Sequence, residues 1–121
     1  MVISNAVVCD LDGERVVDVR VENGTICEIG SSLRDAEVYD ASGLYLLPSL
    51  FDTNIRLKDM VLNSKNILDV TKEAKKGGIG HIVLNPTTTP SIDNEVVLEF
   101  AQNSIKDIDE IDVALMLNTI K

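Results

Sequence analysis

The stretch LYLLPSLFDTNI, residues 44–55, decides the fold of this chain of 121 residues. The pattern of the sequence changes at Pro48, inside this stretch. Before Pro48 the apolar segments are short, rich in Val and Ile, and separated by turn residues, which is typical of β structure. After Pro48, apolar segments of strand length alternate with segments of helical periodicity. We therefore expect two portions, residues 1–48 and residues 49–121.

Residues 1–48 have the pattern of a small antiparallel β assembly. Valines alternate with charged residues through residues 15–21, so the valines share one face of a strand. The Asn23-Gly24 dipeptide follows, and it favours a tight two-residue hairpin because both of its residues must adopt positive φ. Residues 25–29 are the expected return strand. The further strands expected in this portion are residues 3–4, 7–9, 37–39 and 44–47.

Residues 49–121 have the order β-α-β-α-β. We expect Ser64 and Asp93 to cap the two helices, because their side-chain oxygens can accept hydrogen bonds from the first free amides. Apolar strands in units of roughly 30 residues are typical of parallel strands joined by crossover helices. Three strands are too few to close an eight-stranded barrel, which needs ~250 residues. The expected strands are residues 50–55, 81–84 and 113–117, and the first helix is residues 64–76.

The charge of the chain excludes one class of partner. Twenty acidic residues against eleven basic ones give a formal net charge of −9. Such a surface repels phosphate backbones, so we expect no nucleic-acid partner. The densest basic cluster is Lys72, Lys75 and Lys76, which we interpret as the end of a helix, where cations complement the dipole.

The sequence also predicts the cellular compartment of the protein. No stretch approaches the ~18 consecutive apolar residues of a membrane span, and the N-terminus lacks the features of a signal peptide. Cys9 and Cys27 lie in separate strand segments without CxxC spacing, so we expect two buried free thiols. These features predict a cytoplasmic protein without a membrane partner.

Several motifs, in order, resemble one family. The segment DASGLYLLP (40–48) leads into LFDT (50–53), and this is similar to the barrel entry of amidohydrolases of the dihydroorotase type. The segment KGGI (76–79) resembles the family's turn into strand two, PTTTPSIDN (86–94) its Pro-Asn-Thr loop, and residues 112–121 its strand three. The resemblance implies an α/β fold: an N-terminal β-sandwich portion, then the first three β/α units of a metal-dependent-hydrolase TIM barrel.

The resemblance also implies where the chemistry of the family would lie. Family members place His-x-His-x-Arg directly after the Asp-Thr of strand one; the two histidines bind zinc and the arginine binds the substrate carboxylate. In this chain Asn54 and Arg56 occupy the two ligand positions, and Lys58 occupies the carboxylate-binding position. Thr87 stands where the family has a substrate-binding asparagine.

These replacements predict that the chain has no catalytic residues and no metal ligands. Asparagine is a poor zinc ligand, and the guanidinium of Arg56 cannot be one because it stays protonated. Lysine in place of arginine loses the bidentate grip on a carboxylate, so Lys58 and Thr87 are interpreted as vestigial substrate-binding positions. We therefore expect no cofactor in this chain, although the family uses zinc.

Other residues have two interpretations each. His81, the only histidine, lies at the start of an expected strand, away from the end where barrel chemistry occurs, so we favour a structural role. Asp52 and Asp59 could build a new hard-metal site, which is the minor alternative. Arg56 and Lys58 could form an anion pocket; we favour instead that Arg56 fills the vacated metal cavity and pairs with an acidic residue of another strand.

The sequence thus leads to a functional hypothesis with alternatives. The first is a non-catalytic, structural dihydroorotase homologue of pyrimidine biosynthesis that associates with aspartate carbamoyltransferase. Self-association is the other partner hypothesis, since an open parallel sheet exposes apolar edges. The rival is an active dihydroorotase or cyclic-amide hydrolase whose full-length form takes metal ligands from later strands. A third is an N-terminal piece with no function apart from its parent.

Overall fold

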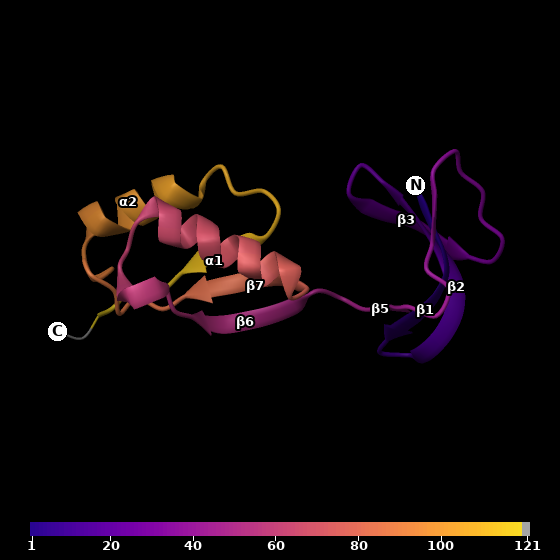
Figure 1. Ribbon diagram of the computed structural model, residues 1–121, viewed down its shortest axis with the longest axis horizontal. Coiled ribbons are helices and arrows are strands. Elements are labelled where there is room, and N and C mark those ends of the chain that lie inside the picture. Colours follow the sequence, from indigo (N-terminus) through magenta and orange to yellow (C-terminus); the bar gives the residue numbers. More distant parts are fainter. Residues whose placement is uncertain (120–121) are drawn as a thin grey trace. The chain divides into compact units, whose positions relative to one another are not determined.

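The computed structural model of the chain describes residues 1–119 (Figure 1). The contacts divide it into two compact units, Met1–Pro48 and Ser49–Lys121. No helix among residues 1–119 is long and apolar enough to cross a membrane.

The first unit is a five-stranded sheet with the order β3-β2-β1-β4, and β5 also pairs with β1. The β1–β2 and β2–β3 pairs are antiparallel, whereas β4 and β5 run parallel to β1. The sequence predicted an antiparallel portion, and for β4 and β5 this is wrong. Local alternation shows that a strand exists, but not which distant strand it will pair with. The strands are β1 (Val2–Asp10), β2 (Gly13–Glu22), β3 (Thr25–Gly30), β4 (Val38–Asp40) and β5 (Tyr45–Leu46).

The predicted hairpin between β2 and β3 is confirmed. Asn23 and Gly24 form its turn with φ values of 49° and 75°, and the pairing closes on Glu22 opposite Thr25. Both φ values are positive, as a two-residue turn that follows the strand twist requires.

One long strand, β1, replaces two short segments that the sequence predicted. Its pairing with β2 shifts between Ile3 and Ala6, and Asn5 lies in the shift with a φ of 58°. The carboxylate of Asp18, only 8% exposed, accepts the backbone amide hydrogen of Asn5 at 2.9 Å and that of Leu33 at 3.0 Å. Because a buried polar group must be hydrogen-bonded, Asp18 satisfies two amides that the irregular backbone leaves unpaired.

The core of the first unit is small. It consists of short apolar side chains, and the residues are Ala6, Val8, Val19 and Ala41. No residue of β3 is buried. The cysteines are free, but the prediction that both are buried is wrong, because Cys9 is half-buried and Cys27 is exposed. Burial raises the pKa of the Cys9 thiol, and the nearby carboxylate of Glu14 adds to this effect.

The second unit is a parallel three-stranded sheet with the order β6-β7-β8. The predicted order β-α-β-α-β is confirmed, although the third strand ends at Leu115 rather than 117. The last two residues of the chain, which the resemblance assigned to this strand region, lie outside the described residues. The elements are β6 (Leu50–Ile55), η1 (Lys58–Met60), α1 (Ser64–Lys76), β7 (Ile79–Leu84), α2 (Glu95–Ile105) and β8 (Asp112–Leu115).

Both helices pack on one face of this sheet, as Figure 1 shows. Alternate residues of β7, Ile82 and Leu84, point to this face and are almost fully buried. They meet Ile67 of α1 and Ala101 of α2. The crossover helices make the strands parallel, so the carboxyl ends of β6, β7 and β8 lie together at one end of the sheet. This end of the sheet is called the carboxyl edge.

The helix caps differ from the prediction by one residue each. Asn63 caps α1 and accepts the amide hydrogen of Asn66 at 2.7 Å, whereas Ser64 is the first helical residue. Asn94, and not Asp93, caps α2. Each pair consists of two good capping residues, and only the backbone decides which one takes the extended conformation that a cap requires.

Substitution of Asn63 tests the observed cap. We expect Asn63→Ala to lower the free energy of unfolding by about 1 kcal/mol, because an amide of the first turn loses its acceptor. Ser64→Ala is the matched control and should change it by less than about 0.5 kcal/mol. Urea unfolding followed by circular dichroism measures both, and a larger loss for Ser64→Ala would contradict this assignment.

Candidate functional site

The register of β6 against β7 shapes the edge where the candidate residues lie. Asp52 pairs with Ile82 and Ile55 pairs with Leu84, so β6 contains one residue more than β7 between these pairs. The carboxylate of Asp52 accepts the backbone amide hydrogen of Asn54 at 3.0 Å. The extra residue forms a bulge, a feature that re-aims a side chain at the end of a strand.

A chain of hydrogen bonds joins the ends of the two strands. Asn54 Oδ1 accepts from Asn85 Nδ2 at 2.8 Å, and Asn85 Oδ1 accepts from the backbone amide of Thr87 at 2.8 Å. The Asn85 backbone amide also donates to the carbonyl of Ile55 at 2.8 Å. Two residues selected from the sequence, Asn54 and Thr87, are therefore brought together through Asn85.

Sequence reasoning missed Asn85. The signal was present, because Asn85 is the polar residue between the end of a buried strand and Pro86. Its carboxamide has both a donor and an acceptor, so it can bond to Asn54 on one strand and to the start of its own loop.

The loop after β7 is also tied to the segment after β6. Thr89 donates its backbone amide hydrogen to the carbonyl of Met60 at 2.7 Å, and the carbonyl of Thr89 accepts from Leu62 at 3.0 Å. Asn66 Nδ2 donates to the carbonyl of Lys58 at 3.1 Å and to that of Val61 at 2.9 Å. The edge is therefore a bonded frame and not two independent loops.

The two cations of the candidate site are exposed. Arg56 and Lys58 follow β6, and among residues 1–119 neither side chain takes part in an ion pair or a hydrogen bond. The structure places both near the strand ends, as the sequence predicted, but neither forms an ion pair with an acidic residue among residues 1–119. The acidic residue expected to face Arg56 is not among the described residues.

His81 lies away from this edge. It is paired across the sheet with Phe51 of β6 and Asp112 of β8. Its ring stacks on Phe51 with centroids 4.1 Å apart, and its Nδ1 lies 2.8 Å from Asp112 Oδ2. This geometry is a cross-strand contact near the strand starts.

The described residues contain no group of three or more His, Cys, Asp and Glu side chains that could hold a metal ion. Asp52, one half of the alternative metal site, already uses a carboxylate oxygen for the amide of Asn54. Asp59 lies in η1 with a φ of 53°. The two carboxylates therefore form no metal-binding cluster in this part of the chain.

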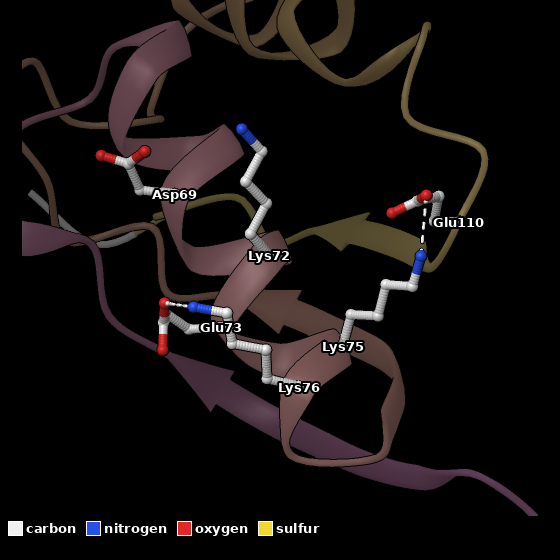
Figure 2. A pocket seen from close by; sticks show the side chains of 6 residues that line it. All are labelled: Asp69, Lys72, Glu73, Lys75, Lys76 and Glu110. Carbon is white, nitrogen blue, oxygen red and sulfur yellow. Dashed lines mark hydrogen bonds and ion pairs between the residues drawn. The ribbon is translucent and has the colours of Figure 1, made fainter.

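A hollow lies beside the carboxyl-terminal half of α1 (Figure 2). Lys75 pairs with Glu110 at 2.7 Å and Lys76 pairs with Glu73 at 2.8 Å. The hydrogen bond to Glu73 raises the pKa of Lys76. Lys75 and Lys76 lie in the last turn of α1 and are paired and exposed, so the interpretation as a helix end is confirmed for these two residues. Lys72, the third residue of the predicted cluster, lies one turn earlier in α1.

The chain is similar in sequence to several dihydroorotases. No family model matches the sequence. The dihydroorotase of Ruminiclostridium cellulolyticum is 36% identical over 96 residues, which are 77% of this chain and 22% of that protein. The dihydroorotase of Trichlorobacter lovleyi is 39% identical over 94 residues, which are 74% of this chain and 22% of that protein. The chain thus spans about a fifth of the length of these relatives.

A solved structure shows the same fold. L-hydantoinase (dihydropyrimidinase) from Arthrobacter aurescens superimposes with a TM-score of 0.76 and 22% identity, over 94% of this chain and 26% of that one. The chain belongs to the dihydroorotase-like amidohydrolases. The fold class predicted from the resemblance, an α/β chain with an N-terminal β portion before its β/α units, is confirmed.

The backbone arrangement of the site and the identity of its side chains are two different questions. The dihydroorotase-like frame is present as strand ends, loop and helices. The resemblance places the metal-ligand positions at Asn54 and Arg56, and the assignment of these two positions stays a prediction. The structure adds that Asn54 Oδ1 bonds to Asn85, so this oxygen is already part of the frame.

Loss of the Asn54 carboxamide should destabilise the loop that follows β7. We expect Asn54→Ala to cost about 1 kcal/mol of unfolding free energy, because Asn85 loses its acceptor. Faster hydrogen exchange of the Thr87 amide should accompany this loss, whereas Asn54→Asp, which keeps an acceptor, should remain near the original chain. Equal exchange rates in all three proteins would show that Asn54 does not hold the loop.

Proposed function

We propose that this chain is a non-catalytic, structural dihydroorotase homologue of pyrimidine biosynthesis that binds aspartate carbamoyltransferase. The observation that carries the proposal is the Asn54–Asn85 hydrogen bond at the carboxyl ends of β6 and β7. A side-chain oxygen at a position where the family has a zinc ligand serves here as a structural acceptor. The activity of the relatives needs a metal-activated water, for which this edge supplies no imidazole.

The positive charge of Arg56 is a second argument against metal binding at this position. A fixed cation at Arg56 opposes a divalent ion at the same place, since two like unit charges 4 Å apart repel by ~4 kcal/mol at an effective dielectric of ~20. Among residues 1–119 no carboxylate pairs with Arg56 to neutralise it. Metal binding at this edge is therefore opposed both by charge and by the lack of ligands, and Lys58 and Thr87 remain only as vestiges of substrate binding.

The uncovered face of the second unit supports a larger fold around these strands. The helices cover one face of the β6-β7-β8 sheet, while on the other face Phe51 is 69% exposed. Parallel sheets are normally covered on both faces. We propose that these strands begin a TIM barrel, and that the surface of the complete barrel is what a partner recognises. A cytoplasmic location is part of the same proposal.

The second candidate is an active dihydroorotase or other cyclic-amide hydrolase. The identity of 36% and 39% to proteins named dihydroorotase favours it. In that case strands beyond this chain supply all the metal ligands, and Arg56 and Lys58 bind the substrate carboxylate.

Metal analysis and a dihydroorotate hydrolysis assay on the full-length protein separate the two candidates. The structural proposal predicts less than stoichiometric zinc after dialysis and no turnover. The double variant Asn54→His with Arg56→His supplies two imidazoles and removes the cation, so it should retain more zinc than the original protein. Stoichiometric zinc together with turnover in the unaltered protein would overturn the structural proposal.

Co-purification tests the partner. The full-length protein should elute with aspartate carbamoyltransferase of the same organism in size-exclusion chromatography, and mixing should raise the melting temperature of one of the two. The zinc-retaining variant is the control, because its changes lie at the strand ends and should leave the complex intact. Separate elution with unchanged melting temperatures would refute the association and leave self-association as the remaining partner hypothesis.

A further inference from the structure

The β2–β3 hairpin carries a chemical feature that the proposed function does not use. Gly24 follows Asn23 at the tip, and no other asparagine of the chain precedes a glycine. Both residues are exposed, and nothing lies within 4 Å of where a Gly24 Cβ would be. The turn at Gly24 is thus open to water, and the Gly24 nitrogen directly follows the residue that carries the carboxamide.

The asparagines elsewhere in the described structure are held in place. Asn63 and Asn94 cap helices through their side-chain oxygens, and Asn54 accepts from Asn85, which is followed by Pro86 and therefore by a nitrogen without a hydrogen. Asn103 lies inside α2, where the next amide belongs to the helix. By contrast, no hydrogen bond of the Asn23 side chain is found among residues 1–119.

We propose that Asn23 is a site of spontaneous deamidation, controlled by opening of the β2–β3 hairpin, whose isoaspartate product keeps β3 from pairing with β2. The reaction needs only water. The Gly24 nitrogen loses its proton to solvent base and bonds to Cγ of Asn23, and the Cγ–Nδ2 bond breaks to release ammonia. Water then opens the cyclic imide. Cleavage at Cγ gives aspartate, and cleavage at the main-chain carbonyl gives isoaspartate.

The hairpin controls the first step because its turn restrains the backbone. The turn holds Asn23 at a φ of 49°, and the pairing of Glu22 with Thr25 closes directly next to it. The Gly24 nitrogen reaches Cγ by rotation about ψ and χ1 of Asn23, and the closed turn restrains ψ, so we expect the reaction when the turn loosens. Loosening is a local event, because β3 has no buried residue and the core of the first unit lies in other elements. The ion pair of Arg20 with Glu28 joins β2 to β3.

The product changes the geometry of the turn. Isoaspartate brings Cβ into the main chain and lengthens the loop between Glu22 and Thr25, which pair directly across the hairpin. The turn type and the loop length set the register of a hairpin, so we expect an added main-chain atom to disturb the pairing next to the turn. Release of β3 would leave the edge of β2 unpaired, and an unpaired edge is a surface for association.

The test is to incubate the chain at neutral and at mildly alkaline pH and to map its peptides by mass spectrometry. Asn23 should exchange its amide for a carboxyl severalfold faster than Asn103, which is the exposed control within the same chain, and the rate should rise with pH. Glu28→Gln, which removes the cross-strand ion pair, should accelerate the reaction. Equal rates at Asn23 and Asn103, or no acceleration in Glu28→Gln, would overturn the proposal.

The consequence for β3 is tested by hydrogen exchange on the aged chain. The amides of Ile26 and Ile29, which lie in the β2–β3 pairing, should lose protection in the isoaspartate form. Asn23→Asp is the matched control, because it makes the same change of charge without an added main-chain atom, and it should retain protection. Retained protection in the isoaspartate form would refute the release of β3.

Discussion

The parallel pairing of β6 with β7 is the constraint on which the described site depends. The extra residue in β6 forces a bulge, and the carboxylate of Asp52 satisfies the amide of Asn54 within it. Asn54 can then reach Asn85, and Asn85 holds the start of the next loop through Thr87. Without this pairing the same polar residues would lie on two separate loops, with no reason to meet.

The two units differ in what stabilises their small cores. The second unit buries branched side chains of β7 and α1 between a sheet and two helices. The first unit has only a few valines and alanines to bury, and it relies on the carboxylate of Asp18 to bond the irregular backbone. Because so little of β3 contributes to that core, the hairpin tip can open without unfolding the unit.

Features of the fold that depend on local interactions could be predicted from the sequence, whereas features that depend on distant residues could not. The Asn23-Gly24 hairpin, the helix from Ser64 to Lys76 and the alternation of strands after Pro48 were predicted, because dipeptides and periodicity decide them locally. The parallel course of β4 and β5 was not, because their partner β1 lies far away in the chain. The position of Asn85 before Pro86 was a local signal, but its role was missed because its hydrogen bond depends on Asn54 of another strand.

The sequence by itself determined the family frame and the identity of the residues at its chemical positions. Asparagine, arginine and lysine stand at 54, 56 and 58 whatever the fold does, and the charge of the guanidinium belongs to the residue. Only the tertiary structure decided how these residues are used. The register of two strands turns Asn54 into an acceptor for Asn85, while Arg56 remains exposed, because hydrogen-bond partners depend on which strand ends lie side by side.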